Sequence, residues 1–177
     1  MPRRAFTFWN RIFPQPARWA LAALTLLPAI PAEARDNLGM YESWGAFRDP
    51  AVPRCYAIAM ATPSPLRRDY QPYATVGNWP KRGVRNQVHF RLSRKLAARA
   101  GIVLRIGRDR FVLTGGGGDA WAANRQMDAA IVAAMRSADK MSVYARDEKG
   151  RIFSDNWPLA GAATAMDAAT VACAKLR

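Results

Sequence analysis

The sequence predicts a mainly β domain: a β-sandwich with one inserted helix and a C-terminal helix, closed by a disulfide. Most apolar runs after residue 34 are short or alternate every second residue, as strands do, and turn-forming residues separate them. Two segments, 127–139 and 161–177, instead repeat apolar residues at helical spacing. The two cysteines fall in one strand-like and one helix-like segment. A half-open barrel would give a similar order of elements.

Residues 1–34 have the layout of a secretory signal peptide. Four arginines and no acid precede the apolar run WALAALTLLPAI, and an A-x-A site follows at 32–34. The run of 12 residues is shorter than the roughly 20 that a membrane-spanning helix needs. We therefore expect cleavage after Ala34 and a single exported domain, residues 35–177, with no transmembrane segment. An uncleaved membrane anchor is the alternative.

In an oxidising compartment, two cysteines are first interpreted as a disulfide, here Cys55 with Cys173. A metal site would need more ligands than these distant cysteines and the lone His89 supply, so we expect neither a metal nor a cofactor. A Cys–His nucleophile pair is the catalytic alternative. Neither cysteine lies in a recognisable nucleophile turn, and no paired carboxylates or G-x-S-x-G motif suggest another catalytic site.

The strand segments follow in order along the chain. The apolar run 54–62 predicts a buried strand, the proline-rich segment 63–72 a surface loop, and 73–79 a short strand. In 85–92, apolar Val88, Phe90 and Leu92 alternate with polar residues, which places His89 on a wet, basic face. Segment 93–101 is either a short helical turn or a basic loop. Two hairpins are expected, at 101–115 around GRD and at 140–159 around DEKG.

The glycine run TGGGGDAW lies between the first hairpin and the first helix. It lacks the GK[ST] ending of a phosphate-binding loop, and Asp119 would repel a phosphate, so we interpret it as a mobile loop. The first helix has Asp128 early and Arg136 late, as helices prefer. In the last helix, one stripe contains Ala162, Met166, Ala169 and Cys173.

Positive charge is concentrated in one part of the chain. The full sequence has a net charge of +14, and loss of the signal peptide with four arginines and one glutamate leaves +11. Segment 81–110 holds ten basic residues and one acid. Such a face attracts phosphate, lipid A, acidic glycans or nucleic acid, although a solvated face explains the same count. The candidate anion-binding residues are Arg85, Arg91, Arg94, Arg105, Arg108 and Arg110.

The chain resembles the invasion-associated locus B family of exported alphaproteobacterial proteins over roughly residues 44–173. The matching pieces, in order, are SWGAFRD…RCYAIAMATP, GIVLRIG…RFVLTGGGGDAWA, AIVAAMRSADKMSVYARDEKG and WPLAGAATAMDAATVAC. The resemblance implies an immunoglobulin-like β-sandwich in the periplasm or envelope, without known enzymatic activity, in which Cys55 and Cys173 form the family disulfide. The basic segment 81–110 and the proline–arginine insertion TPSPLRRDYQP depart from the family pattern.

We therefore expect a non-catalytic protein of the periplasm or cell envelope. Its expected partners are anionic envelope components, such as lipopolysaccharide and acidic glycans, or envelope proteins. Specific nucleic-acid binding is not expected, because few aromatic residues lie between the basic ones. The alternatives are a structural partner in an envelope complex and a hydrolase that uses a thiol or His89.

Overall fold

The computed structural model describes residues 35–174. The predicted signal peptide, residues 1–34, lies outside the described residues. No helix in the described part is long and apolar enough to cross a membrane. The strands are β1 (Asp36–Tyr41), β2 (Trp44–Asp49), β3 (Arg54–Met60), β4 (Tyr73–Trp79), β5 (Val84–Arg91), β6 (Ile102–Ile106), β7 (Asp109–Gly116), β8 (Asp119–Trp121), β9 (Lys140–Arg146) and β10 (Ile152–Pro158). The helices are α1 (Arg125–Met135), α2 (Ala162–Ala174) and the short 3-10 helix η1 (Pro80–Arg82).

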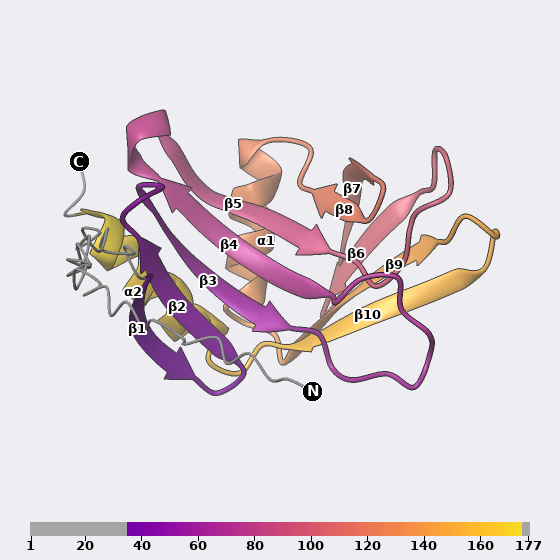
Figure 1. The fold of residues 1–177 in the computed structure, drawn as a ribbon, viewed down its shortest axis with the longest axis horizontal. Helices are drawn as coiled ribbons and strands as arrows, with labels where there is room; N and C mark the ends of the chain where they lie inside the picture. Colours follow the sequence, from indigo (N-terminus) through magenta and orange to yellow (C-terminus); the bar gives the residue numbers. More distant parts are fainter. Residues whose placement is uncertain (1–34, 175–177) are drawn as a thin grey trace, which may run out of the picture. The chain divides into compact units, whose positions relative to one another are not determined.

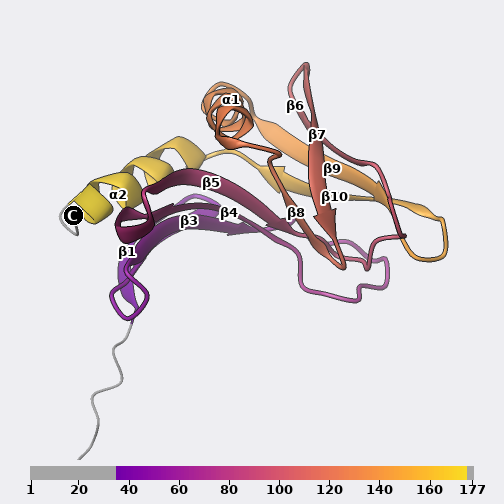
Figure 2. The same cartoon turned by 90° about the horizontal axis from the view of Figure 1, so that it is seen from above.

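The strands of residues 35–174 form one antiparallel sheet in the order β1-β2-β3-β4-β5-β8-β7-β6-β9-β10 (Figure 1). β7 joins its two halves, because residues 109–113 pair with β6 and residues 114–116 pair with β8. We call β1–β5 with β8 the first half, and β6, β7, β9 and β10 the second half. Figure 2 shows the sheet bending between the halves, with both helices on the same side of β1–β5.

One hydrophobic core joins the two halves. Phe90 of β5 and Trp157 of β10 are both fully buried, and their ring centroids lie 5.4 Å apart. The predicted alternation in β5 is confirmed, since Val88, Phe90 and Leu92 are all buried. Because the inner faces of both halves supply this core, the arrangement is sandwich-like. The mainly β class, the inserted helix and the C-terminal helix are confirmed.

Helix α2 packs against the inner face of β1–β4 through small side chains. The strands present Ala57 and Ala59 there, and the helix presents Ala165 and Ala169, all of them buried. Because alanine adds only one carbon to the backbone, the helix can lie close to the sheet. This contact leaves the opposite, outer face of β3 and β4 uncovered by either helix (Figure 2).

The disulfide between Cys55 of β3 and Cys173 of α2 is present, as predicted. The two Cα atoms lie 5.6 Å apart, and the bond closes a loop of 118 residues. By the chain-entropy argument, a loop of this size stabilises the folded state by about 5 kcal/mol. The bond fixes α2 to the first half of the sheet, while the second half has no covalent link of this kind.

Helix α1 is anchored at its first turn. The Asn124 side chain accepts the Met127 N–H at 2.9 Å, which caps the helix. The buried Asp128 carboxylate accepts the Val88 N–H at 2.8 Å, so it continues the hydrogen bonding of β5 past the end of β8. Burial raises the pKa of Asp128, and the hydrogen bond from Val88 opposes the shift.

The mobile loop predicted for the glycine run is wrong, because residues 114–121 form a tight hairpin. β7 continues to Gly116, the chain turns at Gly117 with φ +66°, and β8 begins at Asp119. A Cβ at Gly115 would collide with the carbonyl oxygen of Asp119, so glycine permits this close pairing. The glycines therefore allow β7 and β8 to pair closely. In the sequence, a glycine run of this kind is typical of a loop, so the pairing was not predicted.

Candidate functional site

The six candidate arginines of segment 81–110 lie in four separate places. Arg85 is at the start of β5 and Arg91 at its end, six residues apart, which is about 20 Å in an extended strand. Arg94 follows β5 in a loop, and the remaining three candidate arginines lie on the β6–β7 hairpin. The six candidates therefore have different surroundings.

Arg91 is paired with a carboxylate. Its guanidinium donates to Asp119 of β8 at 2.5 Å and lies over the ring of Tyr70, 3.8 Å from the centroid. Asp119 also forms a hydrogen bond with Nε2 of His89 at 3.0 Å, so one carboxylate binds both the Arg91 guanidinium and the His89 imidazole. Arg91 thus has a structural partner within the fold.

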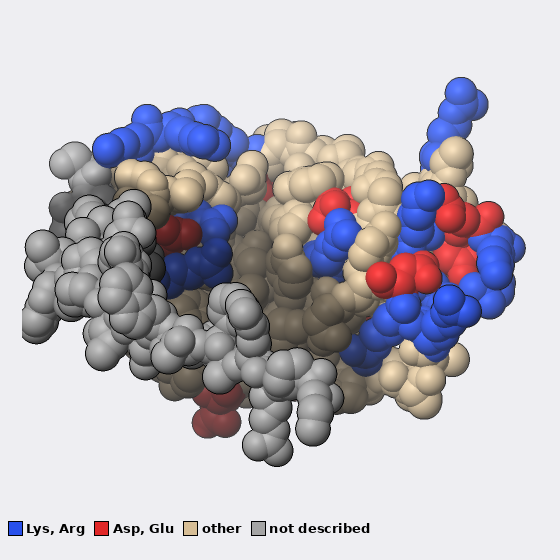
Figure 3. Space-filling view, in the orientation of Figure 1, with Lys and Arg blue, Asp and Glu red and all other residues tan. Residues whose placement is uncertain are grey.

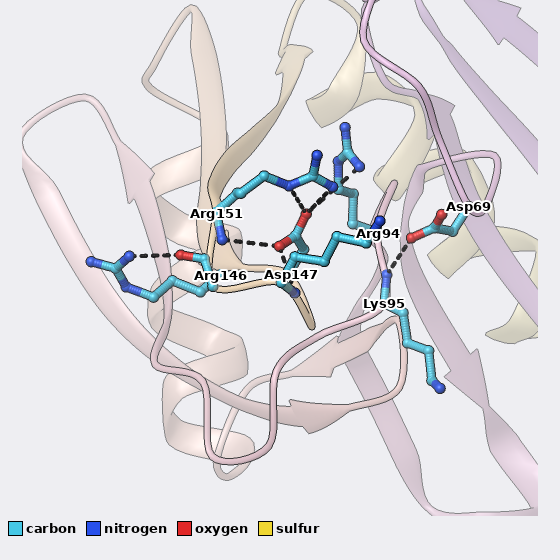
Figure 4. A network of polar contacts seen from close by, with 8 residues as sticks. Asp69, Arg94, Lys95, Arg146, Asp147 and Arg151 are labelled. Atoms are coloured by element: carbon cyan, nitrogen blue, oxygen red, sulfur yellow. Dashed lines mark hydrogen bonds and ion pairs between the residues drawn. The ribbon is translucent and has the colours of Figure 1, made fainter.

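Arg94 belongs to a compact charged network around Asp147, which Figure 4 shows from close by. The Asp147 carboxylate accepts a hydrogen bond from the Nε–H of Arg151 at 2.9 Å. Nη1 of Arg94 lies 3.6 Å from Oδ2 of the same carboxylate. The hydrogen bond from Arg151 is the main cause that holds the pKa of Asp147 below its usual value, against the opposing effect of burial. In the same network, the Lys95 N–H donates to Asp69 at 3.1 Å, which ties the 61–72 loop to the segment after β5. Arg94 is therefore neutralised as well.

Arg85 lies in a second basic cluster with Lys81 and Arg82 of η1. All three side chains are exposed and have no carboxylate within 4 Å among residues 35–174. Basic side chains gather over this turn between β4 and β5 at the upper left of Figure 3. The cluster is far from the hairpin arginines along the sheet order.

Arg105, Arg108 and Arg110 surround the turn of the β6–β7 hairpin. Arg105 and Arg110 are directly opposite each other in the ladder, on the outer side of the strands, and Arg108 lies in the turn. All three are exposed, and within the described chain none of them forms an ion pair. Like charges directly opposite each other destabilise a strand pair. No carboxylate in residues 35–174 pairs with these arginines to offset that loss of stability.

A shallow groove of about 410 Å³ adjoins Arg105. Arg105 lines it together with Lys140 and Tyr144 of β9, and Asp139 contributes one acid. Tyr144 is 40% exposed, so an apolar ring lies beside the cations. We call Arg105, Arg108, Arg110, Lys140 and Tyr144 the hairpin surface. The last two were missed by sequence reasoning, although the alternation in KMSVYAR already places Tyr144 on the face opposite the core.

His89 points away from the core, as predicted, and lies on the outer face of the sheet, in one groove with Arg35 and Arg54. Its side chain is only 19% exposed and lies between Tyr73 and Trp121, with ring centroids 5.8 and 5.0 Å away. Asp119 is its hydrogen-bond partner, and in the described part of the chain no serine, threonine or thiol donates to the imidazole. Both cysteines of the sequence are in the disulfide, which leaves no free thiol for a Cys–His pair.

Comparisons with protein-family models, with characterised proteins and with solved structures give no match.

Proposed function

We propose that this protein is a non-catalytic component of the periplasm or cell envelope, of the invasion-associated locus B kind, and that it binds phosphate-bearing envelope components through the hairpin surface. Lipopolysaccharide is the envelope component that best fits, since it presents phosphates beside apolar chains. The layout of residues 1–34 and the Cys55–Cys173 disulfide support an oxidising compartment outside the cytosol.

The pairing of Arg105 with Arg110 carries this proposal. The two arginines are opposite each other in the ladder and have no carboxylate partner among residues 35–174, while Arg91 and Arg94 in the same basic segment are each paired. An anion between Arg105 and Arg110 would relieve their repulsion and use the two-point hydrogen bonding of guanidinium with phosphate. The exposed Tyr144 and the stem of Lys140 supply apolar contact at the edge of the same groove.

The test measures binding to vesicles that contain lipopolysaccharide, using protein purified after expression of the full sequence. We expect binding at about 50 mM NaCl and its loss at about 500 mM, because salt screens charge interactions between exposed groups. The triple variant Arg105→Gln, Arg108→Gln and Arg110→Gln should bind at least about tenfold more weakly. Vesicles of phosphatidylcholine alone should bind neither protein.

The second basic cluster offers a matched control. The variant Lys81→Gln, Arg82→Gln and Arg85→Gln loses the same three charges from exposed positions without touching the hairpin. Equal weakening by both variants would show that net charge alone attracts the vesicles and would contradict the proposal. Binding that is independent of salt and of both variants would instead favour the alternative role as a partner in an envelope complex.

A further inference from the structure

The outer face of the first half of the sheet holds a groove of about 520 Å³. It runs across β3, β4, β5 and β8, on the side that neither helix covers. In Figure 3, which views this face, uncharged residues fill a recessed middle, and acidic and basic side chains lie next to each other on either side of it. Its volume falls in the range of about 300–1,000 Å³ that small-ligand sites occupy.

Aromatic rings line this groove, which we call the aromatic groove. Tyr73, His89 and Trp121 form a row across three neighbouring strands, with successive ring centroids 5.8 and 5.0 Å apart. Trp121 is 38% exposed. Tyr56 and Trp79 lie on the same face and line the same groove.

Trp79 packs against a glycine two residues before it in β4. A Cβ at Gly77 would come within 2.6 Å of the indole ring, so the ring packs directly on the backbone of its own strand. The exposed side of a sheet with one buried face is ordinarily polar, and an exposed patch of rings on it indicates an interaction site.

The arginines around the aromatic groove are each within 4 Å of a carboxylate. Arg35 and Arg54 both lie against Asp49, at 3.5 and 3.3 Å. Beyond the other end, Arg91 is paired with Asp119. A phosphate-rich polymer would need cations that are free to bind it, so single-stranded nucleic acid fits this groove poorly.

Uncharged polar groups lie between the rings. Thr75 and Gln87 line the groove, and in the described chain neither side chain forms a hydrogen bond. One hydroxyl and one amide together provide donors and acceptors on a flat, ring-lined floor. This combination suits a ligand that presents an apolar face with hydroxyl groups around its edge.

We propose that the aromatic groove binds a neutral or weakly charged oligosaccharide. One face of a pyranose ring is made of C–H groups, which pack on an aromatic ring, while its equatorial hydroxyls donate and accept hydrogen bonds. Trp121 and Trp79 supply the platforms, and Gln87 and Thr75 bind hydroxyls between them. The site is on the other half of the sheet from the hairpin surface and does not depend on the function proposed for that surface.

Titration with neutral hexasaccharides of glucose and of N-acetylglucosamine, followed by tryptophan fluorescence and calorimetry, tests the proposal. The protein is purified after expression of the full sequence. We expect at least one hexasaccharide to bind, with an affinity that changes less than about twofold between 50 and 500 mM NaCl, because the ligand carries no charge. Trp121→Ala should weaken binding about tenfold, and Gln87→Ala should weaken it by a smaller factor.

Ile152→Ala is the matched control, because Ile152 is also an exposed apolar residue on a strand but lies on β10, outside both the aromatic groove and the hairpin surface. It should leave saccharide binding unchanged. The proposal is overturned if no hexasaccharide binds, or if Trp121→Ala and Gln87→Ala bind as the wild type does. It is equally overturned if oligothymidylate binds in a salt-dependent manner at Trp121, or if sedimentation shows a dimer that Trp121→Ala dissociates.

Discussion

The aromatic groove and the hairpin surface each have three arginines nearby, yet these arginines differ in what they contact. Beside the groove, Arg35 and Arg54 share Asp49, and Arg91 pairs with Asp119. On the hairpin, Arg105, Arg108 and Arg110 have no carboxylate partner in the described fold, and two of them oppose each other.

This difference separates structural arginines from arginines that are free to bind a ligand. A paired guanidinium holds neighbouring strands together and contributes little net charge to its surroundings. An unpaired one opposite a like charge weakens its own strand pair, and only an external anion can offset that effect. Replacing an arginine beside the groove should therefore lower the stability of the fold, whereas replacing a hairpin arginine should preserve or raise it.

The largest effect is expected when the shared partner beside the groove is removed. Asp119→Asn removes the negative charge that pairs with Arg91, whose side chain is less than one third exposed, and leaves one acceptor oxygen where the carboxylate had two. We expect a loss of about 1–3 kcal/mol in the free energy of unfolding, measured by urea denaturation. Asp109→Asn is the control, because Asp109 is exposed on the hairpin and unpaired in the described chain; it should stay within about 0.5 kcal/mol of the wild type. Equal stability of the two variants would remove the distinction between the surfaces.

Gly77→Ala tests the shape of the groove. The added methyl group must displace the Trp79 ring, so we expect saccharide binding to fall about tenfold while lipopolysaccharide binding stays unchanged. Gly101→Ala is the control, since a Cβ there meets nothing within 4 Å. Wild-type saccharide affinity in Gly77→Ala would show that the position of Trp79 does not matter for binding.

Arg110→Glu should separate stability from binding on the hairpin. It replaces a like-charged pair by an opposite-charged one with Arg105, which is expected to raise the free energy of unfolding by roughly 0.2–1 kcal/mol. Binding to lipopolysaccharide vesicles should fall at the same time. Arg91→Glu beside the groove should do the reverse for stability, because it places a second carboxylate next to Asp119. A destabilised Arg110→Glu would mean that Arg110 has a structural role that the ladder does not reveal.

The fold could be predicted where the pattern is local. The apolar pattern located β3 to β7, β9, β10 and both helices, and the cysteine count gave the disulfide. β1 and β2 were not identified from periodicity, because β1 contains Gly39 at a register shift and both strands mix charged with apolar residues. β8 has only three residues, and its pairing depends on glycines that sequence reasoning assigned to a loop.

The candidate sites could be predicted only in part, because pairing between distant residues decides their character. The basic segment 81–110 was evident, but Arg91 is neutralised by an aspartate 28 positions later. The aromatic groove draws Tyr73, His89 and Trp121 from three strands, so no local motif contains it. The position of His89 between Tyr73 and Trp121 follows from the order of strands in the sheet.

The smallest effect is expected in how the free energy of unfolding depends on pH for variants of the two surfaces. Burial alone would raise the pKa of Asp49, but the Val52 N–H and the guanidinium groups of Arg54 and Arg35 outweigh it, so the pKa lies below its usual value. The carboxylate therefore stabilises the folded state fully above the ordinary aspartate pKa of about 3.9, and this contribution is lost as the pH falls through the lower pKa of the folded protein. We expect the difference in unfolding free energy between the wild type and Asp49→Asn to be constant from about pH 8 to pH 5 and to shrink below about pH 4.

The hairpin arginines have no carboxylate partner among the described residues, so the difference between the wild type and Arg105→Gln should not change over the same range. Urea denaturation at several pH values measures both differences. A pH-dependent difference for Arg105→Gln would reveal a carboxylate that interacts with the hairpin, and Arg105 would then belong with the paired arginines of the groove.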